Sequence, residues 1–398
     1  MNVVHKYGGT SVATIEKINA VADRIAEIKK AGNNIAVVAS AMGKTTDRLI
    51  EMAKTVNENP SERELDSLMS TGEQTTVTLL AMALEARGVP AVSLTGFQCG
   101  FITDEYHSHA TILDIDSRRL EKIIAEGKVP VIAGFQGINS SGDITTLGRG
   151  GSDTTAVAIA AKLGWDCEIY TDVDGVCTID PRRCPGAKKL DRITCDEMME
   201  LSALGAGVLE TRSVELAKKY GVKLYLGRSL EKDMTKGTYV VNKYFEDVAV
   251  TGIGVIENCA MVTVKCPSGP EAVTKIFEEI ASLNINVDMI SQQQVSRELS
   301  MVSFSCTPDG AKKLSVALEG KKTAYDFEIE DSLAKISLVG AGMVTHSGVA
   351  AKAFAALYRE GIDHYQITTS EISISMTVDR ENLDRACRVL AQEFDLCE

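Results

Sequence analysis

The sequence has few of the residues that usually carry metal or redox chemistry. Its 398 residues include one tryptophan, five histidines and ten cysteines. No two cysteines form a C-x-x-C pair, and no histidine stands at a ligand-like spacing from a cysteine. We therefore expect reduced thiols and no metal ion held directly by protein side chains.

Long apolar runs and an excess of basic residues are missing as well. No hydrophobic stretch approaches the roughly 20 residues that a transmembrane helix needs. The N-terminus has no basic segment followed by an apolar one, so we expect no signal peptide. The net charge of −13 argues against nucleic acid or an anionic membrane as a partner. The composition thus predicts a cytoplasmic protein that binds neither nucleic acid nor membranes.

Strand-like and helix-like segments alternate over the first half of the chain. The apolar run 35–39 predicts a buried strand, whereas 14–30 and 62–87 carry apolar residues at helical spacing. Ser61 followed by Glu64 predicts a capping box before the second helix. The alternation predicts an α/β fold with a mostly parallel sheet. The turns that follow four strands would meet at the carboxyl edge of that sheet; they contain Lys6, Ser40, Gly134 and Thr171.

A glycine-rich stretch, 145–155, reads T-T-L-G-R-G-G-S-D-T-T and precedes an apolar helical run. Glycine lets the backbone approach a ligand closely or adopt positive φ. Ser152 or Asp153 can cap the helix that follows, which leaves free N–H groups facing a ligand. Arg149 adds a planar fork that suits a carboxylate or a phosphate. The stretch therefore predicts a site for a small anion.

Three other segments each allow a functional and a purely structural interpretation. The run 6–9, K-Y-G-G, suits a phosphate, but it can also be a tight turn between a strand and a helix. In the segment 171–182, Asp172 and Arg182 could hold a nucleotide, or the segment could be a surface hairpin. Glu73 lies in the middle of a predicted helix, where it could receive an ammonium group or face solvent.

The second half of the chain repeats itself. Residues 272–290 resemble residues 349–367 at a constant offset of 77, as Phe277 and Phe354 illustrate. Each copy is preceded and followed by a strand-like segment, which predicts two small units with a helix on an antiparallel sheet. A period of this length indicates a duplicated domain rather than a solenoid.

Taken together, these motifs resemble the aspartokinase family. They are K-Y-G-G-T-S, V-A-S-A-M-G-K-T-T-D, S-T-G-E-Q, V-I-A-G-F-Q-G, T-T-L-G-R-G-G-S-D-T-T-A and Y-T-D-V-D-G-V, followed by the paired repeats, and their order matches as well. The resemblance implies an amino-acid-kinase domain at 1–242 and two ACT (βαββαβ, ferredoxin-like) domains at 258–330 and 331–398. Residues 248–257 would complete the second ACT domain.

The resemblance also implies a reaction and a set of site residues. ATP would phosphorylate L-aspartate to 4-phospho-L-aspartate, with Mg²⁺ bound through the ATP phosphates rather than by protein ligands. The catalytic residues would be Lys6, Arg149 and Asp153. Aspartate would be bound by Thr46, Glu73, Arg149 and Ser152, and the nucleotide by Lys6, Tyr7, Gly8, Gly9, Ser40, Thr171, Asp172 and Arg182.

The repeats would form the regulatory part. The resemblance implies that an end-product amino acid binds there, lysine first and threonine second, and that ACT domains pair in a homodimer or larger homo-oligomer. The candidate contacts are Asp288, Met289, Ile290, Gln292, Thr368, Thr369 and Glu371. Each of these could instead be a core residue or an exposed strand edge.

Two alternatives remain open at the level of the sequence. The chain could be an amino-acid kinase for another carboxylate or phosphate, or a regulatory subunit without activity. Cys177 and Gly207 motivate the second alternative, because many relatives carry an aromatic residue and a lysine there. The presence of Lys6, Arg149 and Asp153 argues against it.

Overall fold

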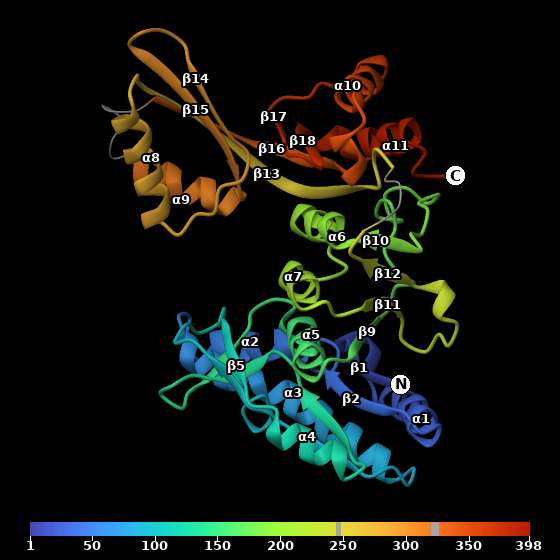
Figure 1. The fold of residues 1–398 in the computed structure, drawn as a ribbon. Helices are drawn as coiled ribbons and strands as arrows, with labels where there is room; N and C mark the ends of the chain where they lie inside the picture. Colours follow the sequence, from blue (N-terminus) through green and yellow to red (C-terminus); the bar gives the residue numbers. More distant parts are fainter. Residues whose placement is uncertain (244–247, 320–325) are drawn as a thin grey trace. The chain divides into compact units, whose positions relative to one another are not determined.

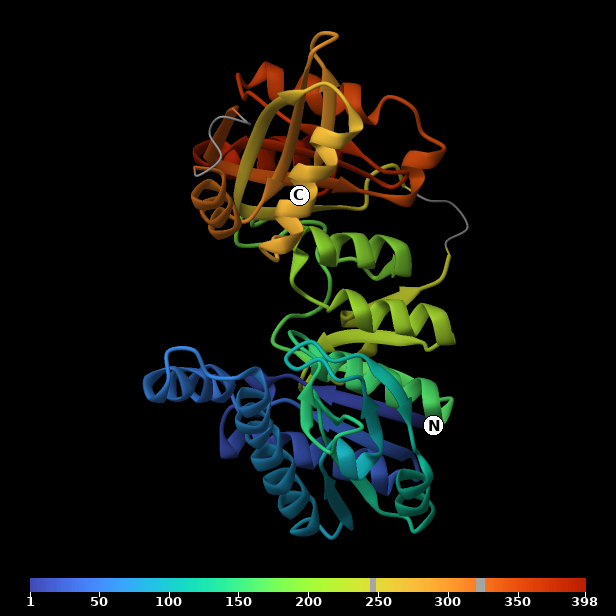
Figure 2. The ribbon, with the colours of Figure 1, turned by 90° about the vertical axis from the view of Figure 1, so that its left-hand side faces the viewer.

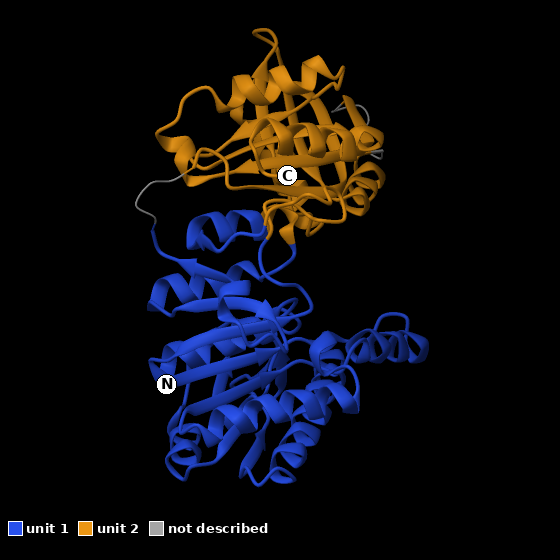
Figure 3. Ribbon diagram, turned by 90° about the vertical axis from the view of Figure 1, so that its right-hand side faces the viewer, with its two compact units in different colours: residues 1–176, 189–202, 207–244 blue, residues 177–188, 203–206, 245–398 orange. Residues whose placement is uncertain are grey.

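The computed structural model describes residues 1–243, 248–319 and 326–398, which form two compact units (Figure 3). Unit 1 comprises Met1–Val176, Lys189–Ser202 and Gly207–Tyr244, and unit 2 comprises Cys177–Lys188, Ala203–Ala206 and Phe245–Glu398. Residues 320–325, within the range expected for the first ACT domain, lie outside the described residues. No described helix is both long enough and apolar enough to span a bilayer.

Unit 1 is built on an eight-stranded sheet (Figure 1). All neighbouring strands are parallel except β11 and β12, which confirms the expected mostly parallel sheet. The β2 strand is buried from Ile35 to Ala39, as a strand covered on both faces should be. The strand order is β10 (Arg192–Thr194), β12 (Thr238–Val241), β11 (Leu224–Arg228), β9 (Asp166–Thr171), β1 (Asn2–Tyr7), β2 (Asn34–Ala39), β6 (Val129–Ala133), β3 (Ala91–Leu94).

Helices cover both faces of this sheet. On one face, α1 (Ile15–Lys30) and α3 (Glu62–Glu85) share a core with Val3 and Tyr7 of β1. On the other face, α5 (Gly151–Leu163) packs on β1, and Lys6 points toward it. Because side chains alternate along a strand, Lys6 and Tyr7 must face opposite sides. The remaining helices of unit 1 are α2 (Thr45–Val56), α4 (Arg118–Ala125), α6 (Cys195–Leu201) and α7 (Thr211–Tyr220).

A small second sheet in unit 1 leads into the glycine-rich stretch. Its strand order is β5 (Ile112–Ile115), β4 (Phe101–Thr103), β7 (Gln136–Ile138) and β8 (Ile144–Thr146). The antiparallel hairpin of β7 and β8 ends at Thr146, and α5 begins five residues later at Gly151. The loop between them is therefore anchored by a strand at one end and a buried helix at the other.

Two expected helix caps do not form. Ser61 makes no side-chain cap on α3, and Glu64 instead pairs with Arg63 at the surface. The N-cap of α5 is Gly150, with φ of +68°, so neither Ser152 nor Asp153 caps that helix. Glu64 and Asp153, which were expected to take part in these caps, pair instead with Arg63 and Lys6.

Unit 2 contains one six-stranded antiparallel sheet with the helices of both repeats on it (Figure 2). The offset of 77 residues relates the last residues of α8 (Pro270–Ser282) and α10 (Val349–Arg359). The strand order is β14 (Ile290–Gln294), β15 (Leu299–Cys306), β13 (Gly252–Pro267), β16 (Asp326–Val339), β18 (Ser373–Asp379), β17 (Ile367–Thr369). The last two helices, α9 (Pro308–Glu319) and α11 (Leu383–Glu393), complete two separate hydrophobic cores.

The long strands β13 and β16 are shared by the two repeats. Residues 252–256 of β13 pair with 335–339 of β16, next to β18. Beyond a register shift between Ile256 and Cys259, residues 260–267 pair with β15, and residues 261–265 pair with β16 as well. The sequence predicts two small sheets, and the structure joins them into one because neither long strand ends at the repeat boundary.

Residues 177–188 pack within unit 2 although they lie in the first half of the chain. The Ile253 N–H donates to the Thr178 carbonyl at 2.7 Å, and the Thr178 hydroxyl donates to the Leu396 carbonyl at 2.5 Å. Arg183 forms ion pairs with Glu257 and Asp384. This segment is therefore tied to β13 and to the C-terminal residues, and it is not a free surface hairpin.

Candidate active site

The centre of the site is an ion pair between β1 and α5. The Lys6 ammonium lies 2.6 Å from Asp153 Oδ1, and both side chains are about nine-tenths buried. Lys6 is the next-to-last residue of β1, and Asp153 is in the first turn of α5. An ammonium group has three donors, so this pair fixes the position of the charge and leaves donors for a ligand.

Four parallel strands bring their carboxyl ends to the same edge. The first residue after three of them donates its N–H to a neighbouring strand: Gly8 to Tyr170, Ser40 to Tyr7 and Gly134 to Ala39, at 3.0–3.1 Å. The Gly8 N–H is thus already bound within the sheet, so it is not a free donor for the predicted nucleotide contact. At Gly9, a Cβ would lie 2.8 Å from the Ala41 carbonyl oxygen, so only glycine fits this turn.

Glu73 carries a buried carboxylate with an unused oxygen. Its Oε1 accepts a hydrogen bond from the Ala41 N–H at 3.0 Å. Its Oε2 is buried and has no hydrogen-bond partner among the described residues. Burial raises the pKa of Glu73 to about 7, although the Ala41 N–H opposes the shift. A buried acceptor of this kind is costly unless a donor, best a cation, binds to it.

Arg149 stands free on a loop of fixed shape. Gly148 and Gly150 have φ of +80° and +68°, and side chains there would collide with His109 and Glu210. The Arg149 side chain is exposed and makes no hydrogen bond or ion pair within the described part of the chain. Its guanidinium is therefore available for a planar anion.

Four other residues of unit 1 were predicted to bind a substrate. Ser152 is buried, and Gly134 approaches it so closely that a Cβ would lie 2.6 Å from its Oγ. Thr46 lies half-buried in the first turn of α2. Thr171 ends β9 and the exposed Asp172 follows it; the Thr171 hydroxyl donates to Asp172 at 3.1 Å. Each of these positions belongs to the carboxyl edge of the sheet or to the first turn of a following helix.

Two predicted nucleotide contacts have side chains that are already engaged within the protein. The Tyr7 side chain is fully buried and stacks on Tyr170, with 5.4 Å between ring centroids, so only its main chain could reach a ligand. Arg182 lies in the 177–188 segment of unit 2, where its guanidinium pairs with Asp180 at 2.7 Å. The sequence pattern did not show that this segment folds with the second unit.

Phe135 was not predicted, although it shapes the site. Its φ is +76°, which is unusual for a residue with a side chain. Its N–H donates to the Thr155 hydroxyl at 3.0 Å, and its carbonyl accepts from the Leu147 N–H at 2.8 Å. Phe135 thereby ties the arginine loop to α5. The flanking glycines of G-F-Q-G were the available signal for such a strained turn.

The predicted regulatory residues lie in two places of unit 2. Asp288 pairs with the buried Lys335, and the Met289 carbonyl accepts from Gln366 Nε2 at 3.1 Å. These contacts bring residues of both repeats together. The other candidates lie at or near the two edge strands of the sheet: Ile290 and Gln292 in β14, Thr368 and Thr369 in β17, and the exposed Glu371 after it.

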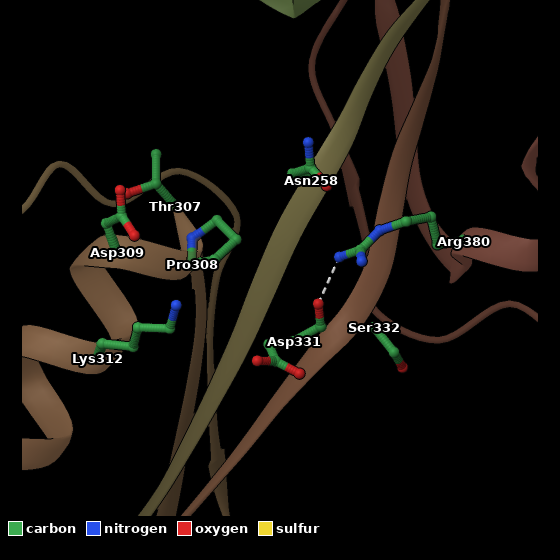
Figure 4. A pocket seen from close by; sticks show the side chains of 8 residues that line it. All are labelled: Asn258, Thr307, Pro308, Asp309, Lys312, Asp331, Ser332 and Arg380. Atoms are coloured by element: carbon green, nitrogen blue, oxygen red, sulfur yellow. Dashed lines mark hydrogen bonds between the residues drawn. The ribbon is translucent and has the colours of Figure 1, made fainter.

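A cavity of about 490 Å³ in unit 2 contains none of these residues (Figure 4). Both repeats line it, since Lys312 belongs to α9 and Arg380 follows β18. Arg380 donates to the Asp331 carbonyl at 2.5 Å, and Asp309 and Asp331 place negative charge beside the two cations. In the described ranges, no three His, Cys, Asp or Glu residues group as a metal site would require.

Comparison with known proteins defines the class that the fold and this site belong to. Residues 1–228 match the amino acid kinase family, and residues 336–394 match an ACT domain. The chain is 46% identical to an aspartokinase of Geobacillus stearothermophilus and 44% identical to aspartokinase 2 of Bacillus subtilis. These matches cover 100% and 99% of the chain, and 98% of each relative. The chain belongs to the aspartokinase family.

Solved structures agree with this assignment. Aspartokinase III of E. coli in complex with aspartate and ADP has a TM-score of 0.81. It covers 99% of this chain and is 24% identical, so it supports the fold. The aspartate kinase of Synechocystis is 41% identical over 99% of this chain and 70% of its own, with a TM-score of 0.56.

Proposed function

We propose that the protein transfers the γ-phosphoryl group of ATP to the side-chain carboxylate of L-aspartate. The observation that carries this proposal is the unpaired, buried oxygen of Glu73, whose other oxygen accepts from the Ala41 N–H close to the carboxyl end of β2. An α-amino acid offers an ammonium group and a carboxylate, and Glu73 and Arg149 complement them. Family membership supports aspartate as that amino acid.

The residues around this pair have defined tasks in the proposal. Lys6 balances the charge that develops on the transferred phosphoryl group, and Asp153 holds Lys6 at 2.6 Å. Thr46 and Ser152 add hydrogen bonds to the amino acid, and Ser40 contacts the reacting groups. The nucleophile is an ionised carboxylate, so the site requires positioning and charge neutralisation rather than a strong base.

ATP is the second substrate, and the proposal places its phosphates beside Lys6 and the turn at 8–9. Gly9 keeps this turn tight, because a Cβ there would strike the Ala41 carbonyl. The proposal assigns Thr171, the last residue of β9, and Asp172, which follows it, to nucleotide binding. Mg²⁺ bound with the nucleotide would neutralise part of the phosphate charge, and the exposed Asp172 is a carboxylate that could hold its water shell.

An assay of turnover tests the proposal directly. The full chain is incubated with ATP, Mg²⁺ and L-aspartate, ADP release is followed, and hydroxylamine traps the acyl phosphate. Glutamate serves as the control substrate. We expect aspartate-dependent ADP release with formation of the hydroxamate. Folded protein that releases no ADP with aspartate would refute the proposal.

Replacing Arg149 by alanine separates the two substrates. We expect KM for aspartate to rise by about 30-fold or more, because a charge-assisted contact worth roughly 2 kcal/mol is lost. KM for ATP should stay within about twofold. Steady-state kinetics with each substrate varied in turn provide the measurement. An equal loss for both substrates would place Arg149 at the phosphates instead.

The proposal extends to regulation by unit 2. It divides the chain into a kinase domain at 1–242 and ACT domains at 258–330 and 331–398, with 248–257 joining the second. The pairing of residues 252–256 with β16 supports that last assignment. The edge strand β14 is exposed along its whole length and offers a surface for homodimers or larger assemblies.

An end-product amino acid is the proposed inhibitor, and lysine is the first candidate. Asp288 already pairs with Lys335, but its carboxylate is half exposed and has a second oxygen for a ligand's ammonium group. The buried Gln366 Oε1 has no partner among the described residues. Titration of lysine and threonine, singly and together, against ADP release is the measurement. We expect lysine to inhibit, and Asp288→Asn to weaken inhibition about tenfold with little change in uninhibited kcat. If threonine inhibits and lysine does not, threonine replaces lysine as the proposed inhibitor.

A further inference from the structure

Asp66 is a fully buried carboxylate that binds the strand leading to Arg149. Its Oδ2 accepts hydrogen bonds from the main-chain N–H groups of Thr146 at 2.9 Å and Ser108 at 2.8 Å. Its Oδ1 accepts from the Thr146 hydroxyl at 2.6 Å. The Ser108 hydroxyl and His107 Nδ1 add longer contacts at 3.4 and 3.3 Å. Hydrogen bonds to a carboxylate are short and strong, so Asp66 is a firm anchor.

Thr146 is the last residue of β8, and Arg149 follows three residues later. The intervening backbone has little freedom. The Leu147 N–H is bound to the Phe135 carbonyl, and Gly148 takes a left-handed conformation against His109. Whatever fixes Thr146 therefore fixes the base of the Arg149 side chain.

Asp66 and Glu73 lie on the same face of α3. Seven residues separate them, which is two helical turns and about 10 Å along the axis. Between them, the Ser70 carbonyl accepts from Gln136 Nε2 at 3.0 Å, and Ser70 is fully buried. The same rigid helix thus carries the acceptor for the ammonium group and, through Asp66, the anchor of the arginine loop.

We infer that Asp66 is a positioning residue that sets the spacing between Glu73 and Arg149, and that it thereby fits the site to an α-amino acid. The inference rests on the proposed function, because it takes Glu73 and Arg149 as the groups that bind the substrate's ammonium and carboxylate. Asp66 does not touch the substrate. It acts by holding two recognition groups at one separation.

The first test compares Asp66→Asn with the wild-type full chain. The asparagine amide removes the negative charge, so the hydrogen bonds from Thr146 and Ser108 to this side chain weaken at nearly constant volume. We expect KM for aspartate to rise tenfold or more, KM for ATP to stay within twofold, and kcat to fall less than fivefold. Asp143→Asn, in the β7–β8 hairpin, is the matched control and should change none of these values; Asp143 pairs with Arg63.

A double variant separates positioning from general damage to the fold. If Asp66 acts only through Arg149, then Asp66→Asn in the Arg149→Ala background should change KM for aspartate less than threefold. Thr146→Val removes the shorter of the two Thr146 contacts and keeps the N–H. Thr146→Val should raise KM for aspartate about threefold. This variant tests the inference if Asp66→Asn does not fold.

The outcomes are separable. If wild-type protein does not turn over aspartate, the proposed function and the inference both fail. If it does, but Asp66→Asn or Thr146→Val leaves KM for aspartate unchanged, only the inference fails. The inference also fails if the effects of Asp66→Asn and Arg149→Ala on KM for aspartate multiply in the double variant. Multiplying effects would show that the two residues act independently.

Discussion

Lys6→Met should lower kcat by about a thousandfold, or roughly 4 kcal/mol in the barrier. The methionine side chain keeps the length and apolar stem of lysine but removes the charge that faces the transferred phosphoryl group. KM for aspartate should change less than threefold, since the proposal assigns aspartate to other residues. Single-turnover measurements with saturating ATP and aspartate would isolate the chemical step.

The structure offers a matched control for this variant. Lys162, in the last turn of α5, pairs with Asp114 at 3.0 Å, and both side chains are exposed. Lys162→Met should leave kcat within twofold. Since Lys6→Met leaves Asp153 buried without its partner, its thermal unfolding must be compared with that of wild type. A folded Lys6→Met protein with kcat within tenfold of wild type would contradict the role given to Lys6.

Glu73→Gln should reduce kcat/KM for aspartate by about a hundredfold at pH 8 and remove a pH dependence. Burial raises the pKa of Glu73 to about 7, so the wild-type carboxylate is largely protonated below that pH. Only the ionised form attracts the substrate ammonium. Wild-type kcat/KM for aspartate should therefore fall about tenfold per pH unit below pH 7 and level off above it.

The control for Glu73→Gln is Glu85→Gln, at the exposed C-terminal end of the same helix, which should keep the wild-type profile. Ionisation of ATP itself would change kcat/KM equally for the wild type, Glu73→Gln and Glu85→Gln. A Glu73→Gln profile with the same inflection near pH 7 would show that another group titrates there.

Glu73 also links activity to stability. A carboxyl group whose pKa is raised in the folded state disfavours folding once the pH exceeds its ordinary value of 4.5. The cost grows up to about pH 7 and then stays near 3 kcal/mol. Glu73→Gln should recover part of this, so its melting temperature should exceed that of wild type at pH 8 but not at pH 4.5.

Local patterns predicted the sheet and most of the edge at which the site lies. The apolar run 35–39 and the polar turn after it placed Ser40, and K-Y-G-G placed Lys6. Parallel strands bring such turns together whatever their distance along the chain. The side-chain alternation of β1 could also have excluded Tyr7, since Lys6 and Tyr7 cannot face the same side.

The contacts that could not be predicted join distant residues. Asp66 binds Thr146 across 80 positions, and an aspartate in a helix gives no sign of its acceptor role. The segment 177–188 packs with residues near the C-terminus, such as Leu396, although its own sequence reads as a turn. Phe135 adopts positive φ because Leu147 and Thr155 hold its backbone from both sides.

The shared strands β13 and β16 have a consequence for folding. Each repeat has its own hydrophobic core, but the register of β13 on β16 runs through both of them. Opening either core removes the strand partners of the other, so the two repeats should unfold in one cooperative transition. Deleting one copy would remove strand partners from β13 and β16 and leave their backbone groups unpaired. Neither copy should therefore fold without the other.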